Sequence, residues 1–213
     1  MRKKLSRIIS FAVCIALVGV LSASCSSAGV SSNGGIPTKE QLSAAVKALG
    51  DDISSLSFSV DGVICQFPMD TGDMMDAGWY FDSDVKSNLK SIPANTLVAP
   101  AVSMRKNAAD GYAATSCSVQ PVNKGTSGIA LEQSVLYNVT FSKSNGTTVI
   151  LPAGITWDST FDEMKKAYNP EQAVDKDGIK YIWINGEDSH FSVQINFNNT
   201  DNTIDSIKFS GRL

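Results

Sequence analysis

The stretch Leu56-Ser57-Phe58-Ser59-Val60-Asp61-Gly62-Val63-Ile64-Cys65-Gln66-Phe67 predicts a β-hairpin. Apolar and polar residues alternate on both sides of Asp61-Gly62, and this dipeptide is favoured in two-residue hairpin turns. A turn of that length places Phe58 opposite Cys65. Cys65 is therefore expected on the apolar face of an antiparallel sheet, directed toward the core.

A helix is predicted just before this hairpin, over Lys39–Leu49. Its apolar residues fall at the spacing of one helix face, and Gly50 follows its last turn. Thr38 and Gln41 stand three residues apart at its start, as in a capping box.

Strands dominate the predicted structure after the hairpin. Short helices are expected at Thr71–Gly78 and Thr160–Tyr168, the second capped by Asp158 or Ser159. The apolar run Ile179–Ile184 indicates a strand buried on both faces. The other predicted strands are Thr96–Met104, Tyr112–Val122, Ser134–Ser142, Thr147–Leu151, Phe191–Phe197 and Thr203–Ser210. This order predicts an α+β fold of antiparallel sheets with short helices packed on one side.

The two halves of the predicted domain resemble each other weakly. Val63–Pro68 precedes a short helix, and so does Val149–Pro152. A duplicated unit of apolar strand, proline, helix and meander would give two related lobes, over residues 37–142 and 143–213. Chance similarity between strand–helix junctions is the alternative.

Residues 1–24 have the three parts of a secretory signal peptide: a basic start, a short apolar run and small residues before Cys25. The apolar run is shorter than the roughly 20 residues that a membrane-spanning helix needs, which disfavours a retained anchor helix. Cys25 stands where the lipobox of bacterial lipoproteins has its acylated cysteine. The match departs from that pattern at one point, because Leu21 lies four positions before Cys25 and Ser22 occupies the usual leucine position. Cleavage without lipidation, which would give a secreted protein, is the alternative.

The predicted mature chain is anchored by lipid at the extracytoplasmic face of the cell membrane. Residues 25–36 are small, polar and rich in glycine, which is typical of a flexible tether. Removal of residues 1–24 takes four of the 18 basic residues and none of the 21 acidic ones, leaving a net charge of −7. This acidic balance argues against nucleic acid as a partner.

Two segments carry a resemblance to a family. Leu151–Thr156 followed by Ser159–Pro170 resembles a recurring segment of uncharacterised surface lipoproteins of Gram-positive bacteria. Phe67-Pro68, with Ala77-Gly78-Trp79 further on, is similar to the companion module of those proteins. The resemblance implies a helix followed by an antiparallel meander, and it implies no particular activity. The layout is also faintly similar to the β-lactamase-inhibitor repeat and to a small lipoprotein of outer-membrane assembly, which are binding proteins.

Candidate catalytic residues are few. His190, the chain's one histidine, is expected on the polar face of a strand with Ser192 and Gln194. A Cys117–His190 pair could imitate a cysteine peptidase, but Cys117 is expected within a strand rather than at a helix N-terminus that would lower its pKa. The spacing of cysteine, histidine and acidic residues indicates no metal site, and no cofactor is predicted.

The sequence thus predicts a binding or scaffolding module for a protein or a cell-envelope ligand, not an enzyme. A small extracytoplasmic hydrolase, an inhibitor-like accessory protein and a solute-binding protein are the alternatives. Within the aromatic residues, Trp79, Tyr80 and Trp157 are the predicted binding face. Cys65 and Cys117 are expected to form a disulfide, since export permits oxidation. Two separately buried thiols are the alternative to that disulfide.

Overall fold

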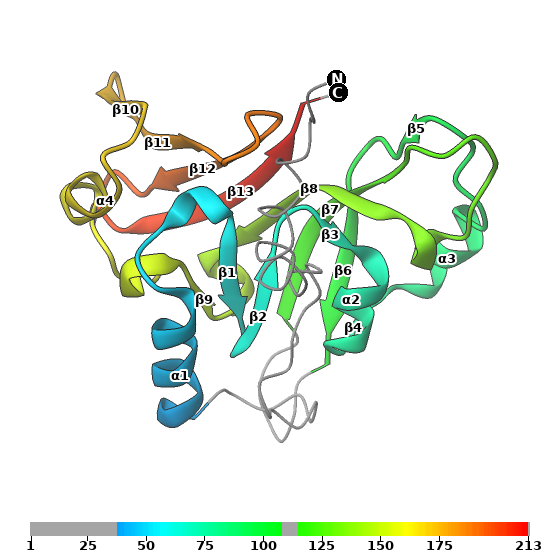
Figure 1. Cartoon of the computed structure of the whole chain (residues 1–213), viewed down its shortest axis with the longest axis horizontal. Coiled ribbons are helices and arrows are strands. Elements are labelled where there is room, and N and C mark those ends of the chain that lie inside the picture. The colour runs from blue at the N-terminus through cyan, green and yellow to red at the C-terminus, as the bar shows by residue number, and fades with distance from the viewer. Residues whose placement is uncertain (1–37, 108–114, 213) are drawn as a thin grey trace, which may run out of the picture.

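The computed structural model describes residues 38–107 and 115–212 (Figure 1). The predicted signal peptide, Cys25 and the tether lie outside this part of the chain. So do the first residues of the predicted strand Tyr112–Val122. Within the described residues the fold is α+β and its sheets are antiparallel, as predicted.

One large antiparallel sheet forms the body of the domain. Its main path runs β10 (Gln172–Lys176), β11 (Ile179–Asn185), β12 (Phe191–Phe197), β13 (Ile204–Gly211), β8 (Val135–Ser142), β7 (Thr115–Asn123), β6 (Val102–Lys106) and β4 (Trp79–Phe81). Two short strands add to it: β3 (Met69–Asp70) pairs with β8, and β5 (Thr96–Leu97) pairs with β7.

A small sheet packs in front of the large one in Figure 1, and the predicted hairpin supplies two of its three strands. These are β1 (Ser57–Val60) and β2 (Val63–Gln66), and β9 (Val149–Ile150) pairs with β1. Phe58 pairs with Cys65, which confirms the predicted register. Asp61 and Gly62 have φ of 49° and 81°, so both turn residues adopt the left-handed conformation of a type I′ turn.

In the described part of the chain, four α-helices and four single-turn 3₁₀ helices surround the sheets. They are α1 (Lys39–Leu49), α2 (Thr71–Asp76), α3 (Ser83–Asn88), α4 (Phe161–Tyr168), η1 (Ile53–Ser55), η2 (Leu131–Gln133), η3 (Lys143–Asn145) and η4 (Pro152–Gly154). The predicted capping box of α1 is present. The cap of α4 is Thr160 rather than Asp158 or Ser159, because the Thr160 hydroxyl accepts the Glu163 backbone N–H.

The core lies between the two sheets. The Phe58 ring of β1 is fully buried and stacks on Phe209 of β13, with ring centroids 4.4 Å apart. Met74 of α2 and Met164 of α4 are buried in the same core. Thus the small sheet, α2 and α4 cover one face of the large sheet, while α1 packs against the small sheet through Ala45 and Leu49.

A buried ion pair lies at the hairpin turn. Asp61 Oδ2 is 3.8 Å from Lys106 Nζ, and the two side chains are 10% and 11% exposed. Asp61 Oδ1 accepts a hydrogen bond of 3.0 Å from the backbone N–H of Thr148. Burial raises the pKa of Asp61, although the Thr148 hydrogen bond and the charge of Lys106 oppose this shift.

The predicted boundary after residue 142 does not separate two sheets. β8 pairs with β7 on one side and with β13 on the other, and β9 pairs with β1. Strands from the two halves therefore pair with each other, and one core cluster contains residues from both halves. The two halves are not independent layers of the fold.

Two predicted strands differ from those observed. Thr96–Met104 is split into β5 and β6, and Pro100 lies in the break, since proline has no N–H to donate to a ladder. β11 was expected to be buried on both faces, which is wrong: Ile179 is 59% exposed, and Tyr181 and Trp183 are only half-buried. They lie on the face of the large sheet opposite the core.

Candidate functional site

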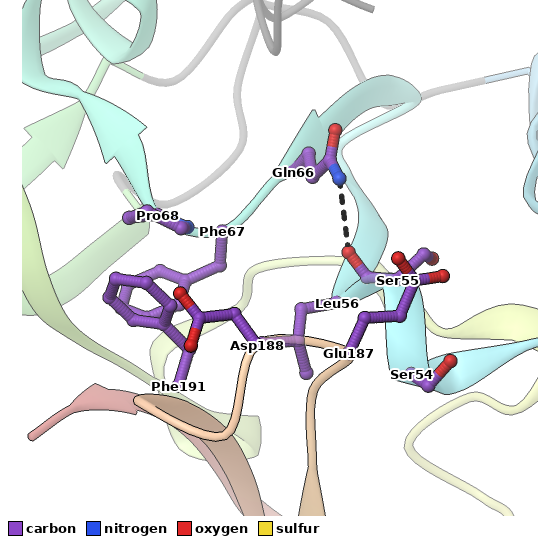
Figure 2. Close-up of a pocket in the computed structure, with 9 residues that line it drawn as sticks. All are labelled: Ser54, Ser55, Leu56, Gln66, Phe67, Pro68, Glu187, Asp188 and Phe191. Atoms are coloured by element: carbon purple, nitrogen blue, oxygen red, sulfur yellow. Dashed lines mark hydrogen bonds between the residues drawn. The ribbon is translucent and has the colours of Figure 1, made fainter.

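A pocket of about 210 Å³ lies where three segments meet: η1, the residues at the end of β2, and the loop between β11 and β12 (Figure 2). The first two segments are close in the chain, whereas the β11–β12 loop follows them by more than 100 residues. The lining residues are Ser54, Ser55, Leu56, Gln66, Phe67, Pro68, Glu187, Asp188 and Phe191.

The η1 side of the pocket is fixed by short-range hydrogen bonds. The carboxylate of Asp52 accepts the backbone N–H of Ser54 at 2.8 Å and caps this single turn. Leu56 then takes a left-handed conformation, and its carbonyl accepts the N–H of Phe67 at 3.1 Å. The Gln66 amide donates to the Ser55 carbonyl at 3.2 Å, the contact marked in Figure 2. These bonds hold η1 beside the end of β2.

The β11–β12 loop is attached to η1 by a direct backbone contact. The Glu187 N–H donates to the Ser54 carbonyl at 2.8 Å. Gly186 makes this approach possible: a Cβ at this position would lie 2.7 Å from Leu56 Cδ1 and 3.3 Å from the Ser54 carbonyl oxygen. The loop can therefore reach η1 because residue 186 has no side chain.

The floor of the pocket is apolar. Leu56 and Phe67 are each 2% exposed, and the ring of Phe67 meets that of Phe191 edge to face at 5.7 Å. Phe191 also contacts Tyr137 at 6.0 Å between centroids, and Lys124 Nζ lies 4.4 Å from the centre of the Tyr137 ring. The floor is thus packed into the core and held in position.

The rim of the pocket is acidic. Glu187 and Asp188 are exposed, and neither lysine nor arginine is among the nine lining residues. Hydrogen bonds from the His190 backbone N–H and the His190 ring lower the pKa of Asp188, and the charges of His190 and Lys124 add to this shift. Asp188 therefore keeps its negative charge to a lower pH than an ordinary aspartate.

His190 lies in the loop just before β12, and its side chain is 74% exposed. Its Nδ1 is 2.7 Å from Asp188 Oδ1. Within residues 38–107 and 115–212, no hydroxyl or thiol hydrogen-bonds to its other ring nitrogen. Cys117 is buried on β7, where burial raises the pKa of its thiol, so it is no candidate nucleophile.

The predicted aromatic binding face is not assembled by the fold. Trp79 is only 1% exposed and lies in the core, which corrects its assignment to a surface. Tyr80 points to the opposite face of β4 and donates to Asn107 Oδ1 at 2.8 Å. Trp157 is half-buried against the core, with its indole N–H donating to the Thr147 carbonyl at 2.6 Å. Alternation along β4 separates Trp79 from Tyr80, since neighbouring strand residues face opposite sides.

The predicted disulfide is also corrected, because no disulfide joins Cys65 to Cys117. Both side chains are 1% exposed in the shared core. Cys65 belongs to the small sheet, opposite Phe58, whereas Cys117 belongs to the large sheet, opposite Met104. Alternation correctly placed each cysteine on a core face, but the two strands are in different sheets.

The pocket itself was not predicted from the sequence. The available signals were the turn-forming run from Gly186 to Asp188 between two strands and the Phe67-Pro68 step that ends β2. Neither segment shows that the other lies beside it, because their proximity depends on how the two sheets pack.

Further features bear on function. None of the helices in the described part of the chain is long and apolar enough to cross a membrane. Across the same residues, no group of three or more histidine, cysteine, aspartate and glutamate side chains is placed to hold a metal ion. Comparison of the chain with protein-family models, with curated proteins and with solved structures found no match.

Proposed function

We propose that the protein is a membrane-anchored extracytoplasmic binding module whose pocket takes a small positively charged group, such as a lysine side chain of a cell-envelope partner. The observation that carries this proposal is that two carboxylates, those of Glu187 and Asp188, lie at the rim of a pocket with an apolar floor. The floor consists of Leu56, Phe67 and Phe191. A lysine side chain has the matching parts, an apolar stem and a cationic head.

The size of the pocket supports a ligand of this kind. Pockets for drug-sized ligands are about 300–1,000 Å³, whereas this one is about 210 Å³. A single side chain or a small amine fits that volume better than a larger metabolite. The half-buried ring of Phe191 also offers a surface to which a cation is attracted.

Two observations support binding rather than hydrolysis. A hydrolase needs a nucleophile next to its base, and the Asp188–His190 contact is not extended by a hydroxyl or thiol within the described residues. The hydroxyl of Ser55 donates to the Asp52 carbonyl and accepts the Ser57 N–H, so it serves the local turn. The location at the membrane rests on the signal-like residues 1–24 and on Cys25.

Calorimetric titration with two matched ligands tests the proposal. Nα-acetyl-lysine methylamide carries the ammonium group, and Nα-acetyl-norleucine methylamide has a similar chain without it. The lysine compound should bind at least tenfold more tightly, since a hydrogen bond to a charged group contributes roughly 1.5–3 kcal/mol. Glu187→Gln should reduce this preference. Asp162→Asn, which neutralises an exposed acid on α4, is the matched control and should leave it unchanged. Equal affinity for the two compounds, or binding of neither, would overturn the proposal.

A further inference from the structure

The large sheet has a second face, opposite the core, which we call the outer face. Three rows of side chains run across the strands on this face, as fixed by the strand register. The middle row is Gln172, Trp183, Gln194, Lys208, Thr140, Ser118 and Ser103. One flanking row is Val174, Tyr181, Asn196, Ser206 and Ser142, and the other is Asn185, Ser192, Ser210, Asn138 and Gln120.

The middle row forms a continuous polar track. It crosses seven neighbouring strands, which at about 4.8 Å per strand makes it about 29 Å long. Every side chain in it is at least partly exposed. Lys208 is the one charged residue in the three rows, so the track is nearly neutral although the chain as a whole is acidic.

Apolar and aromatic side chains are concentrated on β11 at one end of the track. Ile179, Tyr181 and Trp183 alternate along this strand, and all three lie on the outer face. Ile179 is 59% exposed, and the guanidinium of Arg212 lies 5.9 Å from the centre of the Trp183 ring. The strand therefore presents rings and a branched apolar side chain beside the polar rows.

Amide side chains on the outer face are already oriented by one another. Gln194 donates to Asn196 Oδ1 at 2.7 Å, and Asn196 donates to the Ser206 hydroxyl at 3.0 Å. Asn138 donates to Gln120 Oε1 at 2.7 Å. Each amide retains further donors or acceptors for a ligand, because an amide group can make up to four hydrogen bonds.

Ser192 is the one buried residue in the three rows. It lies between Asn185 and Ser210 in one flanking row, and it is only 1% exposed. Its hydroxyl oxygen is buried without a hydrogen-bond partner among the described residues. Such groups are costly. This one marks incomplete polar packing beneath the row, and because it is buried it is not itself a contact for a ligand on the outer face.

We infer that the outer face binds an uncharged, polyhydroxylated chain, a glycan strand, which lies along the middle row and stacks on Trp183. The three rows carry one charge, that of Lys208, and beside them Arg105 and Lys176 are paired with Asp82 and Asp177. This disfavours an anionic polymer, which would need clustered lysine and arginine. The hydroxyls of a glycan both donate and accept, which matches the amides and hydroxyls of the rows. A flat protein partner would instead favour an apolar centre, and here the apolar side chains are confined to one end.

Calorimetric titration with chitohexaose, a neutral chain of six N-acetylglucosamine units, tests this inference on the whole mature chain. We expect binding that Trp183→Ala weakens at least tenfold, and a smaller loss in Gln194→Ala. Ile179→Ala and Val46→Ala form a matched pair, since these are the two large apolar side chains that are clearly exposed in the described residues. Ile179→Ala should weaken binding, whereas Val46→Ala, on α1, should leave it unchanged.

The outcomes that would overturn the inference are equally specific. One is the absence of chitohexaose binding at millimolar concentrations. Another is binding that Trp183→Ala leaves intact. A third is retention on isolated cell walls that protease treatment of the walls abolishes, which would indicate a protein partner. Glu187→Gln should not alter chitohexaose binding, so the test is independent of the proposed pocket ligand.

Discussion

The ring of Phe58 stacks on the ring of Phe209 with centroids 4.4 Å apart, and this contact joins the first hairpin to β13 of the large sheet. Phe58 also meets Phe141 at 5.7 Å. Because Phe58 is fully buried between the two sheets, its loss leaves a cavity that the surrounding strands cannot fill without moving.

Phe58→Ala is therefore expected to lower the free energy of unfolding by about 3–5 kcal/mol. Urea denaturation followed by tryptophan fluorescence measures this change. Val46→Ala on α1 shortens a side chain that is 37% exposed and should cost far less. A loss below about 1 kcal/mol in Phe58→Ala would contradict the packing of the hairpin on β13.

Gly186→Ala is expected to displace the β11–β12 loop from η1. The new Cβ would lie 2.7 Å from Leu56 Cδ1 and 3.0 Å from Leu56 Cγ, and Leu56 is buried and unable to withdraw freely. Such overpacking typically costs about 1–3 kcal/mol. Thermal unfolding and titration with Nα-acetyl-lysine methylamide should both show a loss.

Gly72→Ala is the matched control for that variant. A Cβ at Gly72 would lie 3.6 Å from the Glu132 carbonyl oxygen, an ordinary contact, and Gly72 is within α2. Alanine is the better helix former, so stability should stay the same or rise slightly. Equal effects of the two substitutions would argue against the close approach of the loop to Leu56.

Asp61 makes stability depend on pH in a defined direction. Its pKa is raised in the folded protein, chiefly by burial, so the unfolded chain releases this proton at a lower pH than the folded one. The stabilisation that the protonated Asp61 gives to the folded protein is fully present below the pKa that Asp61 has in the unfolded chain. It is lost as the pH rises through the pKa of Asp61 in the folded protein.

Asp61→Asn removes this titration while its amide oxygen can still accept the Thr148 N–H. The free energy of unfolding of Asp61→Asn minus that of the native protein should therefore be larger at pH 6 than at pH 3. Chemical denaturation at both pH values measures it. A relative stability that falls over this range would show that the pKa of Asp61 is lowered instead.

Cys25→Ala is expected to release the protein from the membrane into the medium, because the predicted lipid has no other attachment point. Partition of the native and variant proteins between detergent and aqueous phases measures the change. Globomycin, which blocks cleavage of lipoprotein precursors, should cause the native precursor to accumulate. Unchanged partition in Cys25→Ala would exclude lipidation at this residue.

Local features of the fold could be predicted from the sequence. The hairpin register follows from alternation around Asp61-Gly62, and the start of α1 follows from Thr38 and Gln41. Both depend on residues close together in the chain. The end of α4 at Asn169, which has a left-handed φ of 43°, is predictable for the same reason.

Features that depend on contact between the sheets could not be predicted in this way. Alternation indicates that Cys65 and Cys117 face a core, but not that their strands belong to different sheets. It also cannot show whether the outer side of β11 is covered, and so the partial exposure of Trp183 was missed. The pocket depends on the contact between Ser54 and Glu187, which lies beyond the reach of any local pattern.

The position of β13 has a consequence for the order in which the molecule assembles. This strand follows the other twelve described strands in the chain, yet it lies inside the large sheet, between β12 and β8. During synthesis the first hairpin emerges well before Phe209, the ring on which Phe58 stacks. The large sheet therefore cannot be completed until β13 has been made. Folding that relies on such distant contacts is slow, and it leaves the apolar face of the hairpin uncovered until the last strand arrives.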